Sequence, residues 1–289
     1  MSKLTEILNL LEFPAEASGF FEEMFEKTGN SPSLTAKLDA LEKLYFESFN
    51  SEELEAKLSE FSNESGYHKY SVDLFLALYS CIRLKDMYAQ KGYSTEFFAH
   101  TMKDLTYKLI ECKKLHDIWG SFVFPWFAGF YKMDRFCLGR LQYEPKVFEF
   151  EYGDIKKKGD TVINIHIPSA GPLLPEDVQE SLRLAYDFFG PNYGDKLVFM
   201  CHSWLLYPPT AAFYPDGSNM KAFYDVFEII HESEEPNDYD LWRVFYVDTK
   251  DYKSLPRETT LQKKFYDHLN AGNHFGNGLG MIVYSPDNK

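Results

Sequence analysis

The chain has 289 residues, of which 45% are hydrophobic and 17% aromatic, and its formal net charge at pH 7 is -14. This length suggests about two domains, and the apolar content excludes general disorder, because such a chain can bury enough surface to offset its ordering entropy. Nucleic acid and anionic membranes are poor partners, since both would repel an acidic protein.

The cysteines and the N-terminus point to the cytoplasm. The four cysteines lie in apolar sequence without paired spacing, so we expect reduced core residues and no metal site (Cys81, Cys112, Cys137 and Cys201). Residues 1–8 are amphipathic and interrupted by Glu6, unlike a secretory signal. The richest apolar run, 118–131, contains Pro125 and is too short to span a bilayer, so no transmembrane segment is expected.

Apolar residues from Leu4 to Asp117 recur at helical spacing, with interruptions at turn signals such as Pro14 and Gly66. Two longer helices are expected at 72–90 and 95–115. This pattern predicts a helical bundle as a first domain, residues 1–120.

Aromatic residues crowd the segment 118–133 that follows, with Trp119, Phe122, Phe124 and Trp126 among them. Such density is typical of a core seam between domains. The alternative is a substrate pocket lined by these rings.

The apolar period changes to that of strands after Asp134. Strands are expected at 136–142 and 147–152, on either side of a hairpin or short connection at Glu144-Pro145-Lys146. A strand at 161–167, a helix at 175–189 and a strand at 196–206 follow. This order implies a right-handed parallel crossover.

The remaining sequence alternates short helices and strands. We expect helices at 219–224, 240–246 and 259–270, strands at 226–233 and 279–284, and a flexible turn at 276–280. Residues 121–289 are therefore predicted to form a second domain with a mixed sheet and flanking helices.

Two histidines follow from this topology as candidates for chemistry. His166 and His202 lie near the carboxyl ends of the two parallel strands, the edge at which such sheets bind ligands. A neutral imidazole can accept a proton near neutral pH. The alternative for each is a core histidine bonded to backbone, and strand register decides whether the two converge.

Two segments carry a family resemblance: His166-Ile167-Pro168-Ser169-Ala170-Gly171-Pro172-Leu173, and Cys201-His202-Ser203-Trp204-Leu205-Leu206. With residues 139–144 and 261–272, they resemble a bacterial family of GNAT-like acyltransferases that has a helical N-terminal domain. The resemblance implies an N-terminal helical bundle followed by a GNAT-like mixed sheet. It also implies an acyltransferase that moves an acyl group from acetyl-CoA or another acyl-CoA to an amine of a small-molecule acceptor.

Site residues follow from the resemblance. The acyl-CoA would lie between the strands that end at His166 and His202, either of which would be the base, with Tyr224 as proton donor to the leaving thiolate. The pantetheine arm and the pyrophosphate would contact Ile165, Ile167, Ser169, Ala170, Gly171 and Leu173. The alternative is a catalytically inactive GNAT-like module for binding or interaction, because the loop has two prolines and is followed by Glu176 and Asp177.

Overall fold

The structure is a computed structural model that describes residues 2–285. It divides into two compact units, Met1–Cys137 and Leu138–Lys289. No helix in residues 2–285 has the length and apolar content needed to cross a membrane.

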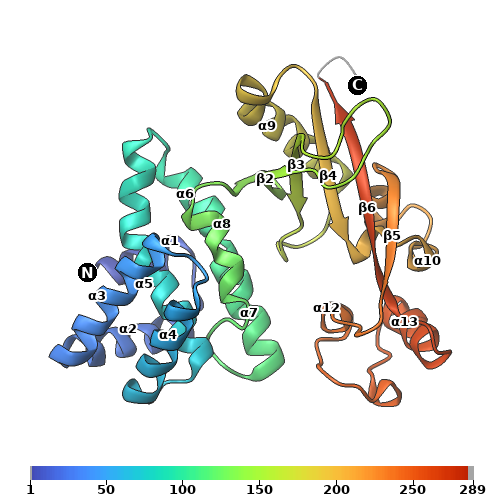
Figure 1. Ribbon diagram of the computed structural model, residues 1–289. Coiled ribbons are helices and arrows are strands. Elements are labelled where there is room, and N and C mark those ends of the chain that lie inside the picture. The colour runs from blue at the N-terminus through green and yellow to red at the C-terminus, as the bar shows by residue number, and fades with distance from the viewer. Residues whose placement is uncertain (1, 286–289) are drawn as a thin grey trace. The chain divides into compact units, whose positions relative to one another are not determined.

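The first unit is helical, as predicted (Figure 1). Its helices are α1 (Lys3–Leu10), α2 (Ala15–Gly29), α3 (Pro32–Glu47), α4 (Glu52–Ser65), α5 (Lys69–Gln90), α6 (Thr95–Met102), α7 (Asp104–His116), the 3-10 helix η1 (Phe124–Phe127) and α8 (Ala128–Tyr131). Several helices begin at a serine whose side-chain oxygen accepts a hydrogen bond from a backbone N–H of the first turn (Ser2, Ser31, Ser51 and Ser94). Helix α5 is buried along most of its length and forms the centre of this unit.

Part of the aromatic segment 118–133 belongs to the core of this helical unit. The ring of Tyr45 in α3 lies 5.2 Å from that of Phe124 and 5.0 Å from that of Tyr131, measured between centroids. The Tyr131 hydroxyl donates to the carbonyl of Ala77 in α5. These rings therefore pack η1 and α8 against the bundle.

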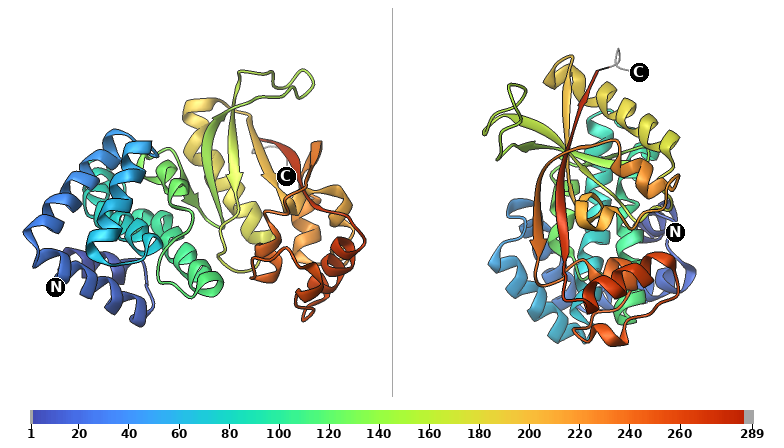
Figure 2. Two further views of the ribbon diagram at one scale, coloured as in Figure 1. Left: turned by 60° about the horizontal axis from the view of Figure 1, so that its bottom comes forward. Right: turned by 90° about the vertical axis from the view of Figure 1, so that its right-hand side faces the viewer.

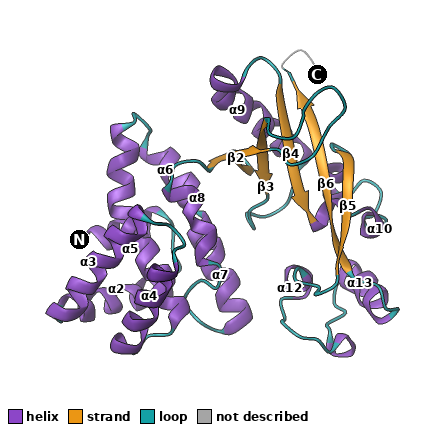
Figure 3. Cartoon of the chain, viewed as in Figure 1, coloured by secondary structure: helices purple, strands orange, loops and turns teal. Residues whose placement is uncertain are grey.

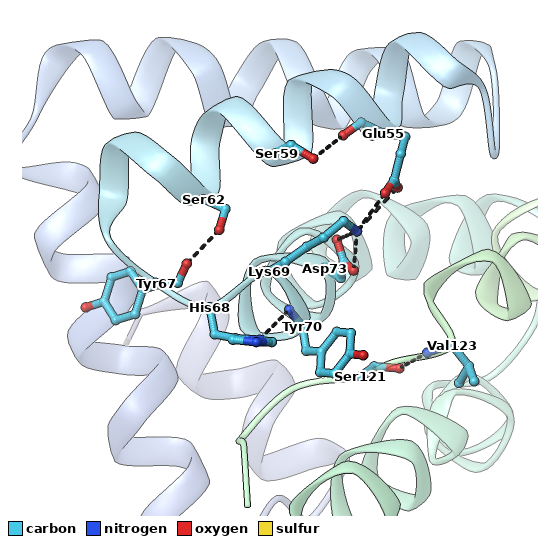
Figure 4. Close-up of polar contacts among 10 residues, drawn as sticks. All are labelled: Glu55, Ser59, Ser62, Tyr67, His68, Lys69, Tyr70, Asp73, Ser121 and Val123. Carbon is cyan, nitrogen blue, oxygen red and sulfur yellow. Dashed lines mark hydrogen bonds and ion pairs between the residues drawn. The ribbon is translucent and has the colours of Figure 1, made fainter. Parts of the chain in front are cut away.

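A charged cluster joins α4 to the start of α5 (Figure 4). Nζ of Lys69 lies 2.9 Å from Oδ2 of Asp73 and 3.0 Å from Oε1 of Glu55. The Asp73 side chain is only 4% exposed. Burial raises the pKa of Asp73 to about 6, and the ammonium of Lys69 opposes this only in part.

The sheet is mixed, as the sequence predicted, and its strand order is β1-β2-β3-β4-β6-β5 (Figures 1 and 3). It lies in the second unit except for Phe136 and Cys137 of β1, which precede the boundary. The strands are β1 (Phe136–Leu138), β2 (Leu141–Val147), β3 (Thr161–His166), β4 (Leu197–Ser203), β5 (Glu228–Glu235) and β6 (Phe275–Tyr284). The helices are α9 (Pro175–Tyr193), η2 (Trp204–Leu206), α10 (Pro208–Ala211), α11 (Asn219–Tyr224), α12 (Leu241–Phe245), η3 (Tyr252–Ser254) and α13 (Thr260–Asn270). β3 and β4 are parallel and are joined through α9, which is the predicted crossover.

The helix expected at 95–115 is two helices, α6 and α7. In the second unit, predictions for three segments were wrong. Glu144-Pro145-Lys146 is not a hairpin but lies within β2, where Pro145 pairs with Ile163. Proline has no backbone N–H to donate to a neighbouring strand. The three-residue β1 does not reach Pro145 on the side of β2 away from β3, so no inter-strand hydrogen bond is lost there. Residues 148–152 form a loop rather than a strand, with an isolated bridge between Tyr152 and Lys156.

The predicted flexible turn at 276–280 is the first half of β6. Its three glycines alternate along one face, where other chain segments approach closely. A Cβ on Gly278 would lie 1.9 Å from the carbonyl oxygen of Leu206, and one on Gly276 would lie 2.5 Å from the ring of Tyr207. Glycine is therefore needed here for packing rather than for flexibility.

The two faces of the sheet are covered differently (Figure 2). One face carries Ile163, Ile165 and Phe199 and meets α9, because Tyr143, which pairs with Ile165, contacts both Ser181 of α9 and the ring of Phe199. We call this the α9 face. The opposite face buries a separate apolar cluster of Phe148, Val162, Val198, Met200, Leu279 and Met281. We call it the histidine face.

Candidate functional site

The parallel strands β3 and β4 pair over a short distance and then part. Their ladder joins Ile163 to Phe199 and Asn164 to Met200. Beyond it, β3 continues to His166 and stays paired with β2, whereas β4 continues to Ser203 and stays paired with β6. The sheet therefore divides into two halves at the carboxyl ends of β3 and β4, the edge at which the sequence predicted a site.

His166 and His202 lie on the same face of the sheet. Paired residues of neighbouring strands share a face, so the pairing of Asn164 with Met200 places the residues two positions further on each strand on that face as well. The register thus meets the condition that the sequence left open: both imidazoles belong to the histidine face.

His166 is held by two polar neighbours on that face. Its Nε2 lies 2.7 Å from Oε1 of Glu144 in β2 and 3.0 Å from the side-chain amide of Asn164. The side chains of His166 and Glu144 are 20% and 17% exposed, so the pair is partly screened from water. When Nε2 carries the proton it donates to Glu144, and the basic lone pair of the neutral imidazole is then on Nδ1.

His202 is more open to solvent than His166. The part of its ring that is buried lowers its pKa below the usual value, and the positive charge of Lys146 and a smaller effect of His231 act in the same direction. Asp240 acts in the opposite direction. A lowered pKa keeps this imidazole neutral at pH 7.

The loop between β3 and α9 is fastened by an arginine. Arg140, in the turn between β1 and β2, donates to the carbonyls of Pro168, Gly171 and Pro172. Ser169 and Gly171 are exposed, whereas the side chain of Leu173 is buried. Helix α9 then begins without a side-chain cap, and Glu176 and Asp177 are in its first turn.

Tyr224 and the remaining predicted contacts lie elsewhere. Tyr224 ends α11, which contacts α9 and η2, so it belongs to the side of the sheet opposite the two histidines. The Lys221 ammonium lies 5.8 Å from its ring centroid. Ile165 is buried toward α9, and Ile167 and Ala170 are half-buried. The predicted residues therefore divide between the two faces and the loop.

The sequence did not single out Glu144, which contacts His166, or Arg140, which contacts the loop. Glu144 was hidden because Pro145 next to it indicated a turn, although Glu144 pairs with Asn164, two residues before His166. Arg140 was seen only as part of a family fragment, and no local pattern indicates that it contacts a loop about 30 residues later. Among residues 2–285, no group of three or more His, Cys, Asp and Glu could hold a metal ion.

Comparisons with known proteins cover nearly the whole chain. Residues 2–133 match the family model of an N-acyltransferase N-terminal domain, and residues 136–282 match that of a GNAT-like C-terminal domain. No curated protein matches the sequence.

Several solved structures share this fold. The chain is similar, with a TM-score of 0.74 and 19% identity over 96% of this chain and 86% of the other, to an acyltransferase in complex with decanoyl-CoA and teicoplanin. A mutant acyltransferase in complex with octanoyl-CoA has a TM-score of 0.66 and 18% identity, with coverages of 97% and 99%. An acyltransferase in complex with CoA and 10C-teicoplanin has a TM-score of 0.66 and 18% identity, with coverages of 96% and 98%.

Proposed function

Because this chain belongs to the family of GNAT-like acyltransferases, we propose that it transfers an acyl group from an acyl-CoA thioester to an amine of a small-molecule acceptor. The observation that carries the proposal is the early end of the β3–β4 ladder, with an oriented imidazole, His166, beside the opening. The structural neighbours contain decanoyl-CoA, octanoyl-CoA or CoA, which supports a thioester of this type as the donor.

The donor would enter where β3 and β4 part. Backbone groups of Ile165, His166 and Ile167 would face the pantetheine arm, and the loop from Ser169 to Leu173 would face the pyrophosphate. A thioester held in this opening is accessible from both faces of the sheet. The amine would approach from the histidine face, and the sulfur would leave toward the side of Tyr224.

The reaction then needs one base and one acid. The amine nitrogen attacks the thioester carbon, the new C–N bond forms, and the nitrogen loses a proton to an imidazole. The C–S bond breaks, and the CoA thiolate takes a proton from the Tyr224 hydroxyl. The products are an amide and free CoA.

We favour His166 over His202 as the base. A catalytic base works best when a third group orients it, and His166 has Glu144 and Asn164 in this role. His202 is exposed and carries no comparable ion pair among the contacts of residues 2–285. Its lowered pKa also makes it a weaker proton acceptor than an ordinary imidazole.

Two further observations bear on the acceptor and on the compartment. The two neighbours that contain teicoplanin or its 10C derivative support an acceptor of small-molecule size. The four cysteines are all buried and none of them forms a disulfide in the structure, which supports a reducing compartment such as the cytoplasm.

The proposal is tested by direct measurement of the donor. Calorimetry with acetyl-CoA, octanoyl-CoA and decanoyl-CoA should detect binding, and release of free CoA thiol should then depend on an added amine. Binding without amine-dependent thiol release from any of these donors would favour the inactive binding module. Absence of binding to all three would reject transfer from an acyl-CoA and favour a module that keeps the fold but takes another partner.

A further inference from the structure

Arg140 joins both ends of the loop between β3 and α9. Its Nη1 lies 3.1 Å from the carbonyl oxygen of Pro168, its Nη2 lies 2.6 Å from that of Gly171, and its Nε lies 2.9 Å from that of Pro172. The guanidinium is a rigid planar fork of donors. Three bonds from one rigid group fix the relative positions of three peptide units of this loop.

Arg140 is itself held in place from α9. Oγ of Ser181 donates to the carbonyl of Leu138 and accepts from the N–H of Leu141, the two residues that flank the turn Gly139-Arg140. Gly139 has a φ of 72°, and a Cβ there would lie 3.2 Å from Cα of Ser181. The turn therefore lies against α9, so Arg140 connects the loop to the same helix that the loop enters.

We call the three hydrogen bonds from Arg140 to the loop carbonyls the Arg140 clamp. The clamp fixes the direction of the loop's backbone N–H groups. In a trans peptide unit the carbonyl and the N–H point in opposite directions. With the carbonyls of Pro168 and Pro172 turned toward Arg140, the N–H groups of Ser169 and Leu173 point away from it. On this basis we infer that Arg140 is a positioning residue that holds the loop in the form that binds the CoA pyrophosphate, an inference that rests on the proposed function.

Attraction between the charge of Arg140 and the pyrophosphate predicts a different result for a lysine variant than the clamp does. If Arg140 only attracted the anionic pyrophosphate, any cation at this position would serve. A lysine keeps the charge but presents a point donor on a flexible stem, and cannot reproduce the three-carbonyl contact. Arg140→Lys therefore separates the two explanations.

The experiment compares an acyl donor that contains the pyrophosphate with one that lacks it. Turnover with octanoyl-CoA and with octanoyl-pantetheine, which lacks the pyrophosphate, is measured for the wild type, Arg140→Gln, Arg140→Lys and the control Arg183→Gln. Arg183 lies on α9, is half exposed and pairs only with its own helix neighbours Glu180 and Asp187 in the ion pairs of residues 2–285. We expect both Arg140 variants to raise KM for octanoyl-CoA roughly tenfold to hundredfold, with little change in kcat.

The two variants should use octanoyl-pantetheine as well as the wild type does, which also shows that they are folded. Equal KM values for octanoyl-CoA in the wild type and Arg140→Gln would overturn the inference, and so would full rescue by Arg140→Lys. Calorimetry with CoA separates this result from a failure of the proposed function. CoA binding that is equal in the wild type and Arg140→Gln rejects the clamp alone, whereas no binding to the wild type rejects the function and the clamp with it.

Discussion

A partly buried ion pair in the helical unit, Lys69–Asp73, and one in the sheet unit, His166–Glu144, differ in what surrounds them. In the helical unit, Lys69 contacts carboxylates on two sides, Asp73 and Glu55 (Figure 4). In the sheet unit, His166 and Glu144 lie beside the point where β3 and β4 part. A lysine ammonium stays protonated near pH 7, whereas an imidazole can gain and lose its proton there. Similar contacts can thus serve stability in one unit and proton transfer in the other.

Replacement of His166 should give the largest effect on activity. His166→Gln keeps a side-chain donor for Glu144 but removes the base, and general-base catalysis contributes about 100-fold to 10,000-fold. We expect kcat to fall by that factor, with the free energy of unfolding changed by less than about 1 kcal/mol. Steady-state kinetics and urea denaturation measure the two quantities.

His231→Gln is the matched control for this change. His231 lies on the same face, with its ring centroid 5.3 Å from that of Phe150, and has no part in the proposed reaction. The kcat of the His231→Gln variant should stay within about twofold of the wild-type value. An active His166→Gln enzyme would refute the assignment of the base.

Replacement of Lys69 in the helical unit should lower stability and leave activity unchanged, the opposite of what we expect for His166. Lys69→Met leaves the buried carboxylate of Asp73 without its ammonium, and loss of one partner of a buried pair costs about 3 to 5 kcal/mol. Because Lys69 is 33% exposed, we expect the lower limit, about 3 kcal/mol of unfolding free energy, with kcat unchanged below the melting transition.

Lys57→Met is the control for this prediction. Lys57 forms an exposed i,i+4 pair with Glu53, with side chains 45% and 65% exposed. Its loss should cost less than about 0.5 kcal/mol. Equal costs in urea denaturation for the two lysine variants would show that burial of Asp73 does not set the energy of the first pair.

The two-unit architecture and the β3–α9–β4 crossover could be predicted because their signals are local. The run from Thr161 to Ile167 is rich in β-branched residues, and Pro175 follows a loop that contains Gly171. Strand alternation together with the observed register puts the two histidines on one face of the sheet.

The partners of His166 and of the loop could not be predicted in this way. Glu144 was lost because a proline in a strand has the same local signature as a proline in a turn. The distinction depends on which strands flank it, which is a property of the whole sheet. Arg140 contacts carbonyls that are 28, 31 and 32 residues away in sequence. Backbone carbonyls carry no residue-specific signal, so only the fold shows this contact.

Asp73 gives a prediction on pH. Its pKa is about 6 in the folded protein and about 3.9 in an unfolded chain. Between these values the folded state holds a proton that the unfolded state has released, so this group makes the free energy of unfolding fall as pH rises from about 4 to about 6. Asp73→Asn should remove that part of the decrease, about 2 kcal/mol.

Denaturation in urea at several pH values from 4 to 7 measures this effect as the difference between the wild type and Asp73→Asn. The difference should grow in favour of the variant as pH rises and level off above about pH 6. A difference that is independent of pH would contradict the raised pKa, whatever its absolute size. Asp39→Asn provides the control, because Asp39 accepts from the Tyr79 hydroxyl at an exposed site.

His202 should give the smallest effect, and it tests which imidazole the opening uses. The two histidines share a face, but only His166 has a carboxylate that orients it. Since His202 is exposed and has a lowered pKa, its replacement by glutamine removes a neutral group that is not fixed in direction. We expect kcat for His202→Gln to stay within about threefold of the wild type, and the acidic limb of the kcat/KM profile to keep its position. A loss of kcat that equals that of His166→Gln, with unchanged stability, would show that both rings act on the same proton, and orientation by Glu144 would then not be what selects the base.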